Sequence, residues 1–382
     1  MLSRPFLLLC LASCLGALGL NLFVVAPRYL REVIDLDARH IGVVMGAHSL
    51  CALLMMVQVP RLAEALGRRL MMQLGILVCA AACAAFALPH AMLPLAGLRG
   101  LMGAGWACVL IGSVTYASEF APPGRLGQAL GIAGVLTLLA MAIGPLVGEQ
   151  LIARFPFYVL CLTATAFMLA GSLVIRALPA PSPAPPANAN VSANASANLP
   201  KPSILRAALL PLLATLLAAA GFGAVYAFLS DYIALRHIPS VTPFFNAYVA
   251  SAILARVSFG SLSDRVGRHL VLIPALLGQG VGLGALALVT RSWQLIPIGV
   301  AFGVSHGLYY PSLQALIVER SPDSARTHAV ASSNFSFSLG MTASAFANGL
   351  VAEYLSYPAV FAAVGGASAL AAVVLVVDRV RT

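Results

Sequence analysis

The sequence predicts an all-α membrane protein, with twelve transmembrane helices in two pseudo-symmetric six-helix bundles. Apolar residues make up 60% of the 382 residues and charged residues only 9%, whereas a soluble domain is about a quarter charged. Apolar stretches of about 20 residues, the length that crosses a bilayer core, recur along the chain. A short loop signature also occurs once in each half. Together these features indicate a duplicated helical membrane bundle.

The apolar stretches define twelve spans, six on each side of a proline-rich tract. We expect helices because long spans in lipid must satisfy their own backbone hydrogen bonds, and no stretch alternates like a barrel strand. The expected spans are residues 6–27, 40–59, 70–89, 92–117, 126–149, 156–177, 204–230, 244–262, 270–290, 293–318, 327–352 and 356–377.

The tract between the halves is rich in Pro, Asn, Ala and Ser. Such residues cannot build a packed core, so the tract predicts a flexible linker. The expected organisation is therefore an N-terminal bundle over residues 1–177, a cytoplasmic linker over 178–203 and a C-terminal bundle over 204–382.

The net charge of +10 could suggest a nucleic-acid partner, but its distribution indicates otherwise. With both termini cytoplasmic, most of the 22 Lys and Arg residues fall on the inner side, which is the positive-inside pattern of membrane proteins. Arg replaces Lys almost throughout and Ala is abundant. This composition suggests a GC-rich bacterial genome and therefore the cell inner membrane. We expect a lipid-embedded monomer that binds no nucleic acid.

All seven cysteines lie in expected helices of the first half. Cys10 and Cys14 share a helix face, as do Cys79 and Cys83, but neither pair has a convincing second set of metal ligands nearby. Buried cysteine behaves as a small apolar residue. We therefore expect packing cysteines, with no metal and no cofactor.

The loop signature combines glycines for a tight turn with a carboxylate among guanidinium groups. It recurs at equivalent places and resembles motif A of the major facilitator superfamily, a resemblance that extends over all twelve spans. The resemblance implies a latch on the cytoplasmic gate. In the second half the latch would use Gly260, Asp264, Arg265, Gly267 and Arg268. The first-half copy would use Glu64, Gly67 and Arg68, and it departs from the pattern at Pro60, Glu64 and Ala65.

Arg99 lies inside the fourth span, where a charge is energetically costly and usually lines a cavity or pairs with another polar group. The alternative is that its side chain reaches the outer interface. The segment around Arg99 resembles motif B of the superfamily, whose Arg is associated with proton coupling.

The fifth span contains Gly144-Pro145 followed by Gly148. Proline removes a backbone hydrogen bond, and the two glycines form a face that allows close helix approach. The pattern resembles motif C, the signature of the antiporter branch, and it favours export over import.

Polar and aromatic side chains within otherwise apolar spans are the remaining candidates for the substrate and proton pathway. Any one of them could instead make an ordinary interhelical hydrogen bond. The segment around His306 is notable because small residues open space beside a side chain that can exchange a proton near neutral pH. The candidates are Asn21, Trp106, Tyr226, Asp231, His306, Tyr309 and Asn334.

We interpret the chain as a secondary active transporter that exports a small molecule by proton-coupled antiport and alternating access. No ATP-binding loop occurs, and no soluble domain interrupts the short loops, so we expect neither an ATP pump nor an enzyme. The first span has no carboxylate, which leaves open an uncoupled facilitator or an importer of a sugar-like or organic-anion solute. A non-transporting membrane sensor or assembly factor is a further alternative.

Overall fold

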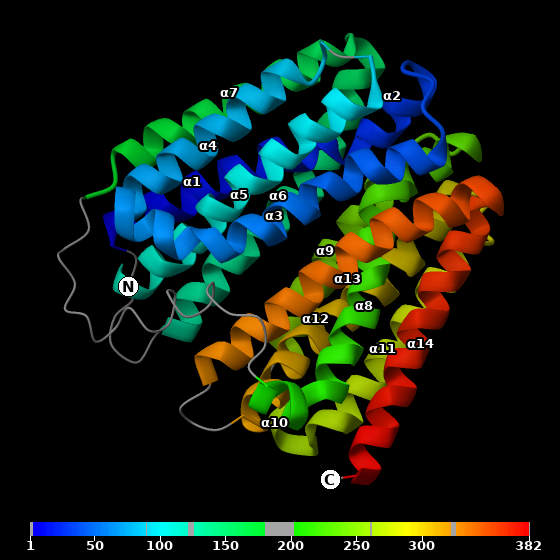
Figure 1. Ribbon diagram of the computed structural model, residues 1–382. Coiled ribbons are helices and arrows are strands. Elements are labelled where there is room, and N and C mark those ends of the chain that lie inside the picture. The colour runs from blue at the N-terminus through cyan, green and yellow to red at the C-terminus, as the bar shows by residue number, and fades with distance from the viewer. Residues whose placement is uncertain are drawn as a thin grey trace. The chain divides into compact units, whose positions relative to one another are not determined.

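The computed structural model describes residues 3–88, 90–120, 126–179, 202–259, 262–321 and 326–381, and throughout these ranges the chain is helical apart from short turns. Helices cross a bilayer without leaving backbone groups unpaired, which explains this exclusive use of one element. Figure 1 shows the helices in chain order. The expected linker lies almost wholly outside the described residues.

Ten helical segments in the described part of the chain are long and apolar enough to span a membrane, and the first of them runs from Arg4 to Glu32. Two further long helices, α9 Thr242–Phe259 and α12 Leu295–Glu319, complete the twelve. Both carry polar or aromatic side chains within their apolar sequence, among them Asn246 and Arg256 in α9 and His306 and Tyr309 in α12. The expected all-α membrane fold is therefore confirmed.

Two compact units make up the chain, and unit 1 consists of Met1–Ala26 and Ala47–Ala197. In unit 1, α1 packs against α5, α6 and α7, and α4 packs against α5 and α7 (Figure 1). The elements that contribute to this unit are α1 Arg4–Asn21, η1 Leu22–Val25, the later part of α3 Ala38–Leu66, α4 Arg68–Ala85, α5 Met92–Phe120, α6 Leu126–Arg154 and α7 Phe157–Arg176.

Unit 2 consists of Asn198–Thr382 together with Pro27–Gly46. Within it α9 packs against α12, α8 against α13 and α14, and α11 against α12 and α14. Besides α9 and α12 it contains α2 Ala26–Glu32, the start of α3, α8 Pro202–Leu235, α10 Leu262–Val266, α11 Arg268–Leu286, η3 Ser292–Gln294, α13 Arg326–Tyr354 and α14 Tyr357–Arg381.

The segment Pro27–Gly46 belongs to the first half of the sequence, yet it groups with unit 2. It forms the corner between α2 and α3, and both α1 and the rest of α3 belong to unit 1. Side-chain contacts described below hold this corner against α8, α13 and α14. The compact units therefore differ from the expected bundle boundaries at these residues.

Glycines allow the helices of each unit to approach closely. In unit 1 a side chain at Gly103 would collide with the carbonyl oxygen of His48. In unit 2, Gly299, Gly303 and Gly307 of α12 face successive turns of α9. Dispersion contacts and close approach, rather than hydrophobic exclusion from water, hold helices together in lipid.

The two loop signatures share one backbone feature. Gly67 and Gly267 both have positive φ, at 77° and 99°, and each immediately precedes the next helix, α4 or α11. Residues with a side chain rarely adopt this conformation, whereas glycine adopts it readily. The duplication seen in the sequence is therefore repeated in the turn geometry.

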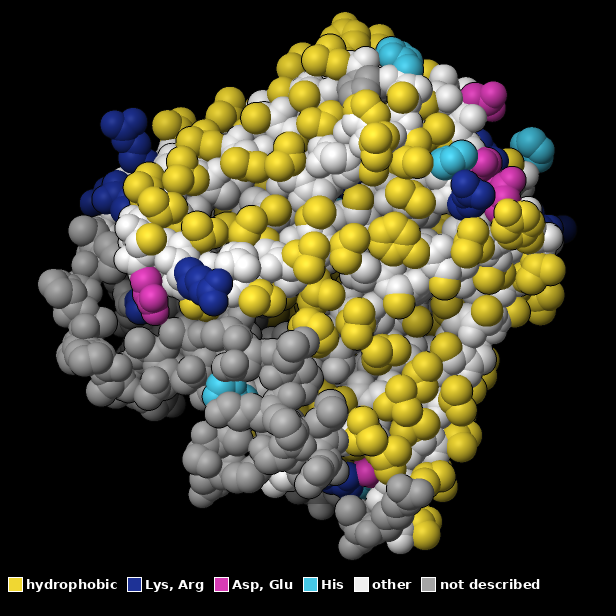
Figure 2. Space-filling view, in the orientation of Figure 1, with side chains coloured by type: hydrophobic (Ala, Val, Ile, Leu, Met, Phe, Trp, Pro, Cys, Tyr) yellow, Lys and Arg dark blue, Asp and Glu magenta, His cyan; other side chains and the backbone are white. Residues whose placement is uncertain are grey.

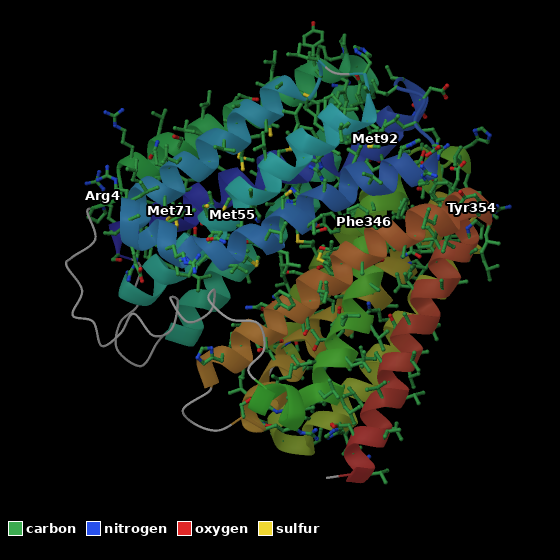
Figure 3. All side chains as sticks on the ribbon, in the orientation of Figure 1. Arg4, Met55, Met71, Met92, Phe346 and Tyr354 are labelled. Carbon is green, nitrogen blue, oxygen red and sulfur yellow. The ribbon has the colours of Figure 1, made fainter. Side chains whose placement is uncertain are left out.

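Apolar side chains also dominate the face of the molecule shown in Figure 2. Large exposed hydrophobic residues include Leu54, Leu173, Val257 and Leu288, which is the pattern of a surface that faces lipid. Inside unit 1, Met55 of α3 and Met71 of α4, labelled in Figure 3, belong to one apolar cluster.

We expect Gly303→Ala to destabilise the protein by about 1–3 kcal/mol, because the new methyl group would overlap the Tyr248 carbonyl and the Ser251 hydroxyl. Gly366→Ala is the matched control, since nothing lies within 4 Å of a side chain added there. Thermal unfolding in detergent should show a lower midpoint for Gly303→Ala and an unchanged or higher one for the control. Equal midpoints would contradict the close packing of α9 and α12.

Candidate functional site

Five aromatic rings surround His306 inside unit 2, and we call these six residues the His306 cluster. The ring of His306 lies 4.7 Å from that of Phe222, measured between centroids. Its Nδ1 atom is 3.1 Å from the hydroxyl of Tyr248. Helices α8, α9, α12 and α13 contribute the five rings, which are Phe222, Tyr248, Tyr309, Tyr310 and Phe337.

One edge of this cluster is polar and half-buried. The hydroxyl of Tyr310 donates a hydrogen bond to Oδ1 of Asn334 at 3.0 Å. The amide of Gln314 donates to the same oxygen at 3.4 Å. All three side chains are partly exposed, and exposing such groups to hydrocarbon is unfavourable. We therefore infer that this edge faces a water-accessible space rather than lipid.

The sequence candidates Tyr309, Tyr226 and Asn334 all lie in or beside the His306 cluster. Tyr309 is fully buried. Tyr226 stacks on Phe222 with ring centroids 5.6 Å apart. Together with His306 itself, four of the sequence candidates therefore lie close together in unit 2.

Arg99 is buried in unit 1, with a side chain on α5 and only 6% of its surface exposed. Its guanidinium carbon lies 5.5 Å from the centre of the Phe23 ring, and Nη1 is 3.6 Å from the sulfur of Met102. Nε has no hydrogen-bond partner, and no described carboxylate forms an ion pair with this side chain. A buried guanidinium with so few partners is unusual, because desolvating a charge is costly. The alternative that Arg99 reaches an exposed interface does not fit this burial.

His48 lies close enough to Arg99 to interact with its charge. Its Nδ1 atom is also buried without a hydrogen-bond partner. The contact depends on Gly103, which lets α5 approach the backbone of α3 at His48. Unit 1 thus holds a basic pair in an apolar environment.

The Gly144-Pro145 and Gly148 pattern of the fifth expected span lies on α6 and packs against the end of α1. Gly144 contacts Asn21, and Gly148 contacts the carbonyl of Leu22, so a side chain at either glycine would crowd this crossing. Pro145 lies inside α6. The side-chain amide of Asn21 donates to the Ala17 carbonyl at 2.8 Å. Trp106, another sequence candidate, instead packs its ring against Gly16 of α1.

Asp231 is almost completely buried, at 1% exposure, and forms an ion pair that joins distant parts of the sequence. Nε of Arg31 lies 2.9 and 2.7 Å from its two carboxylate oxygens. Nη2 of Arg31 donates to the hydroxyl of Tyr357 at 2.7 Å, and that hydroxyl in turn donates to Asp231. We call these three residues the Arg31 triad.

The Arg31 triad is separate from the His306 cluster. Asp231 lies nine residues beyond Phe222 on α8, or about 13 Å along the helix axis. A second contact fixes the same corner, because the backbone N–H of Ala38 donates to Glu353 at 3.0 Å. The triad and this contact explain why Pro27–Gly46 groups with unit 2.

The second-half loop signature forms a small polar network. The guanidinium of Arg268 donates to Glu319, with Nη2 at 2.6 Å, and to the hydroxyl of Ser263 at 2.7 Å. Gly267 makes the turn, and Arg265 is exposed. Gly260 and the side chain of Asp264 lie outside the described residues.

The first-half signature has a simpler arrangement. Glu64 is exposed near the end of α3, Gly67 forms the turn, and Arg68 begins α4. Pro60 lies inside α3, which continues to Leu66, directly before the turn at Gly67.

Three residues of interest were not singled out from the sequence. Arg31 and Tyr357 lie near the ends of expected spans, so nothing local indicated that they meet Asp231. Arg256 lies within the expected span 244–262 and could have been found by the rule that identified Arg99. Its Nε atom is buried and has no hydrogen-bond partner.

No group of three or more His, Cys, Asp and Glu residues within the described ranges could hold a metal ion. The seven cysteines are free thiols within apolar helices.

We expect Asp231→Asn to lower stability by about 1.5–3 kcal/mol, because it leaves the Arg31 guanidinium without its carboxylate. The double variant Arg31→Gln with Asp231→Asn should recover part of this loss. The exposed pair Arg28–Glu32, at 2.9 Å in the neighbouring turn, is the control and should contribute only about 0.3–0.5 kcal/mol. Additive effects at positions 31 and 231, measured by unfolding in detergent, would contradict the ion pair.

The chain is similar in sequence to a known protein family and to several of its members. The family model described as the Major Facilitator Superfamily matches residues 7–259 and 241–382. An uncharacterized MFS-type transporter of Salmonella typhimurium is 25% identical over 364 residues, which cover 92% of this chain and 90% of that protein. The uncharacterized MFS-type transporter YhhS of Escherichia coli K12 is 24% identical and covers 93% of this chain and 87% of its own length.

Solved structures show the same fold. The nucleoside transporter NupG aligns with a TM-score of 0.82 at 13% identity, over 98% of this chain and 99% of that one. The human organic anion transporter MFSD10 aligns with a TM-score of 0.66 at 17% identity, over 97% and 99% of the two chains. The expected superfamily is confirmed, and so is the expectation of a transporter rather than an enzyme. The chain is a multi-pass membrane transporter that belongs to the major facilitator superfamily.

Proposed function

We propose that this transporter exports a small molecule by proton-coupled antiport. The observation that carries the proposal is the buried guanidinium of Arg99, which has no acidic partner among the described residues and lies beside His48. A permanent positive charge in an apolar environment disfavours a second positive charge nearby and attracts an anion. Arg99 therefore biases the protonation of neighbouring groups.

Asp231 is the carboxylate best suited to exchange the coupling proton. In this structure Arg31 neutralises it. The corner that carries Arg31 is continuous with α1 and α3, whose other residues belong to unit 1. Alternating access moves one bundle against the other, and we propose that this motion releases the corner from unit 2 and separates Arg31 from Asp231. A buried carboxylate that loses its cation is stabilised by taking up a proton. Exchange of Arg31 for a proton would then link conformation to protonation.

His306 is the second candidate for proton exchange. Its Nδ1 atom is within hydrogen-bonding distance of the Tyr248 hydroxyl, and its ring is enclosed by aromatic side chains. These rings, with Tyr226 and Asn334 at the edge, suit a substrate that has apolar or planar parts. Trp106 and Asn21 would contribute in the same way from unit 1.

The glycine-proline pattern on α6 supports export as the direction of transport. Gly144 and Gly148 bring α6 against the end of α1, at the crossing where Asn21 lies. The loop residues around Gly67 and Gly267 would act as the cytoplasmic latch, with the Arg268–Glu319 pair as one of its contacts.

The positive-inside distribution of Arg supports cytoplasmic termini. Relatives from Salmonella typhimurium and Escherichia coli support a bacterial inner membrane as the location. We propose a monomer as the working unit, because each bundle contains its own packed core.

An uncoupled facilitator or importer of an organic anion is the second candidate. The observation that favours it is again Arg99, since a guanidinium without a carboxylate partner can bind an anionic solute directly. The similarity in fold to a human organic anion transporter is compatible with such a solute.

We expect inside-out vesicles with an acidic lumen to release protons when an exported compound is added outside. Arg99→Ala should reduce this release at least about tenfold, because removing an interaction with a charged group is worth roughly 1.5–3 kcal/mol. A pH-sensitive dye in the vesicle lumen provides the measurement, with a panel of small molecules as substrates.

Arg154→Gln is the matched control, since Arg154 is exposed at the end of α6 in the same unit. It should leave proton release unchanged. Labelled solutes that equilibrate down their gradients without any proton movement would replace antiport by the facilitator.

A further inference from the structure

Arg256 is a charged residue on α9 that no ion pair in the described part of the chain satisfies. Its Nε atom is buried and makes no hydrogen bond. The carboxylates in the membrane-spanning helices of unit 2 are engaged elsewhere, with Asp231 bound to Arg31, Glu319 to Arg268, Glu353 to Ala38, and Asp378 to His269 and Arg320. The charge of Arg256 thus has no counterpart on the described side chains.

The register of α9 against α12 places Arg256 at the polar edge of the His306 cluster. Gly299 meets Phe244, Gly303 meets Tyr248 and Ser251, and Gly307 meets Ala252 and Ala255. Both helices thus advance together by one turn at each contact. The next turn of α9 brings Arg256 to the level of Tyr310 and Gln314.

Electrostatic interactions agree with this register. The guanidinium of Arg256 lies within electrostatic range of Tyr248, His306, Tyr309 and Tyr310. These four residues belong to the His306 cluster and none of them is an anion at neutral pH. A fixed positive charge therefore lies at one end of a group of aromatic rings.

This combination selects a particular ligand chemistry. A guanidinium presents a planar set of N–H donors that matches a carboxylate in two parallel hydrogen bonds. Aromatic side chains stack on a planar ring at favourable centroid distances. The Tyr310 hydroxyl, the Gln314 amide and the Asn334 amide add partners beside the charge.

We propose that Arg256 and the His306 cluster form the binding site for an aromatic carboxylate, with the carboxylate on Arg256 and the ring against Tyr310 and Phe337, which are partly exposed. This assignment of substrate class rests on the proposed transport function. It differs from a simple interfacial role for Arg256, in which the side chain would only reach the lipid headgroups.

Binding of 2-naphthoate to the purified full-length protein in nanodiscs tests the proposal, with 2-naphthamide as a neutral ligand of the same shape. Isothermal titration calorimetry gives the two dissociation constants without a membrane gradient. We expect 2-naphthoate to bind about 5- to 30-fold more tightly, because hydrogen bonds to charged groups are stronger than neutral ones by roughly that factor. No preference for the anion in the wild-type protein would overturn the proposal.

Arg256→Gln should abolish the preference for 2-naphthoate over 2-naphthamide, and Arg256→Lys, which keeps the charge but lacks the planar donors, should retain part of it. Arg291→Gln is the control, because Arg291 is an exposed residue of the same unit, and it should keep the full preference. A preference that persists in folded Arg256→Gln would also overturn the proposal. If Arg256→Gln does not fold, the partial loss in Arg256→Lys decides instead.

The binding experiment and the vesicle experiment distinguish failure of the proposed site from failure of proton-coupled antiport. An Arg256-dependent preference without proton release from vesicles would support the binding site and remove antiport. Proton release by the panel compounds without any preference for 2-naphthoate would keep antiport and remove this site.

Discussion

The absence of water in the bilayer core is the constraint on which the rest of the structure depends. Every backbone group must find its partner within its own helix, which explains why the described chain is helical in each membrane segment. The same constraint makes unpaired polar side chains costly. Several buried hydroxyl side chains accordingly bond to a carbonyl one turn earlier, as Thr215 does with Pro211 and Ser332 with His328. Arg99 and Arg256, whose Nε atoms lack such partners, therefore stand apart.

Close helix contacts give these charges their position. Glycines on α5 allow the backbone of α3 to approach beside Arg99, and glycines on α12 fix the register of α9 beside His306. Bulkier residues would separate the helices and change which side chains share a level of the membrane. The glycines thus determine the geometry of the candidate sites although they carry no chemistry themselves.

The Arg31 triad connects stability with movement. It holds the corner between α2 and α3 against the second unit, although that corner is continuous with helices of the first. Separating Arg31 from Asp231 would leave a buried carboxylate without its cation. The ion pair therefore favours the arrangement in which the corner packs within unit 2. A transporter needs contacts of this kind that are strong enough to define one state and few enough to be broken when the state changes.

The sequence by itself determined the helical membrane fold, the twelve spans and the duplicated turn with Gly67 and Gly267. These features depend on local properties, namely the length of apolar stretches and the backbone freedom of glycine. It also identified Arg99 and His306, because a polar residue in an apolar span is visible without a structure. Only the tertiary structure paired Asp231 with Arg31 and Tyr357, grouped Pro27–Gly46 with the second unit and placed Arg256 beside the His306 cluster. These relations join residues far apart in sequence, and they depend on helix crossings and register that no local pattern encodes.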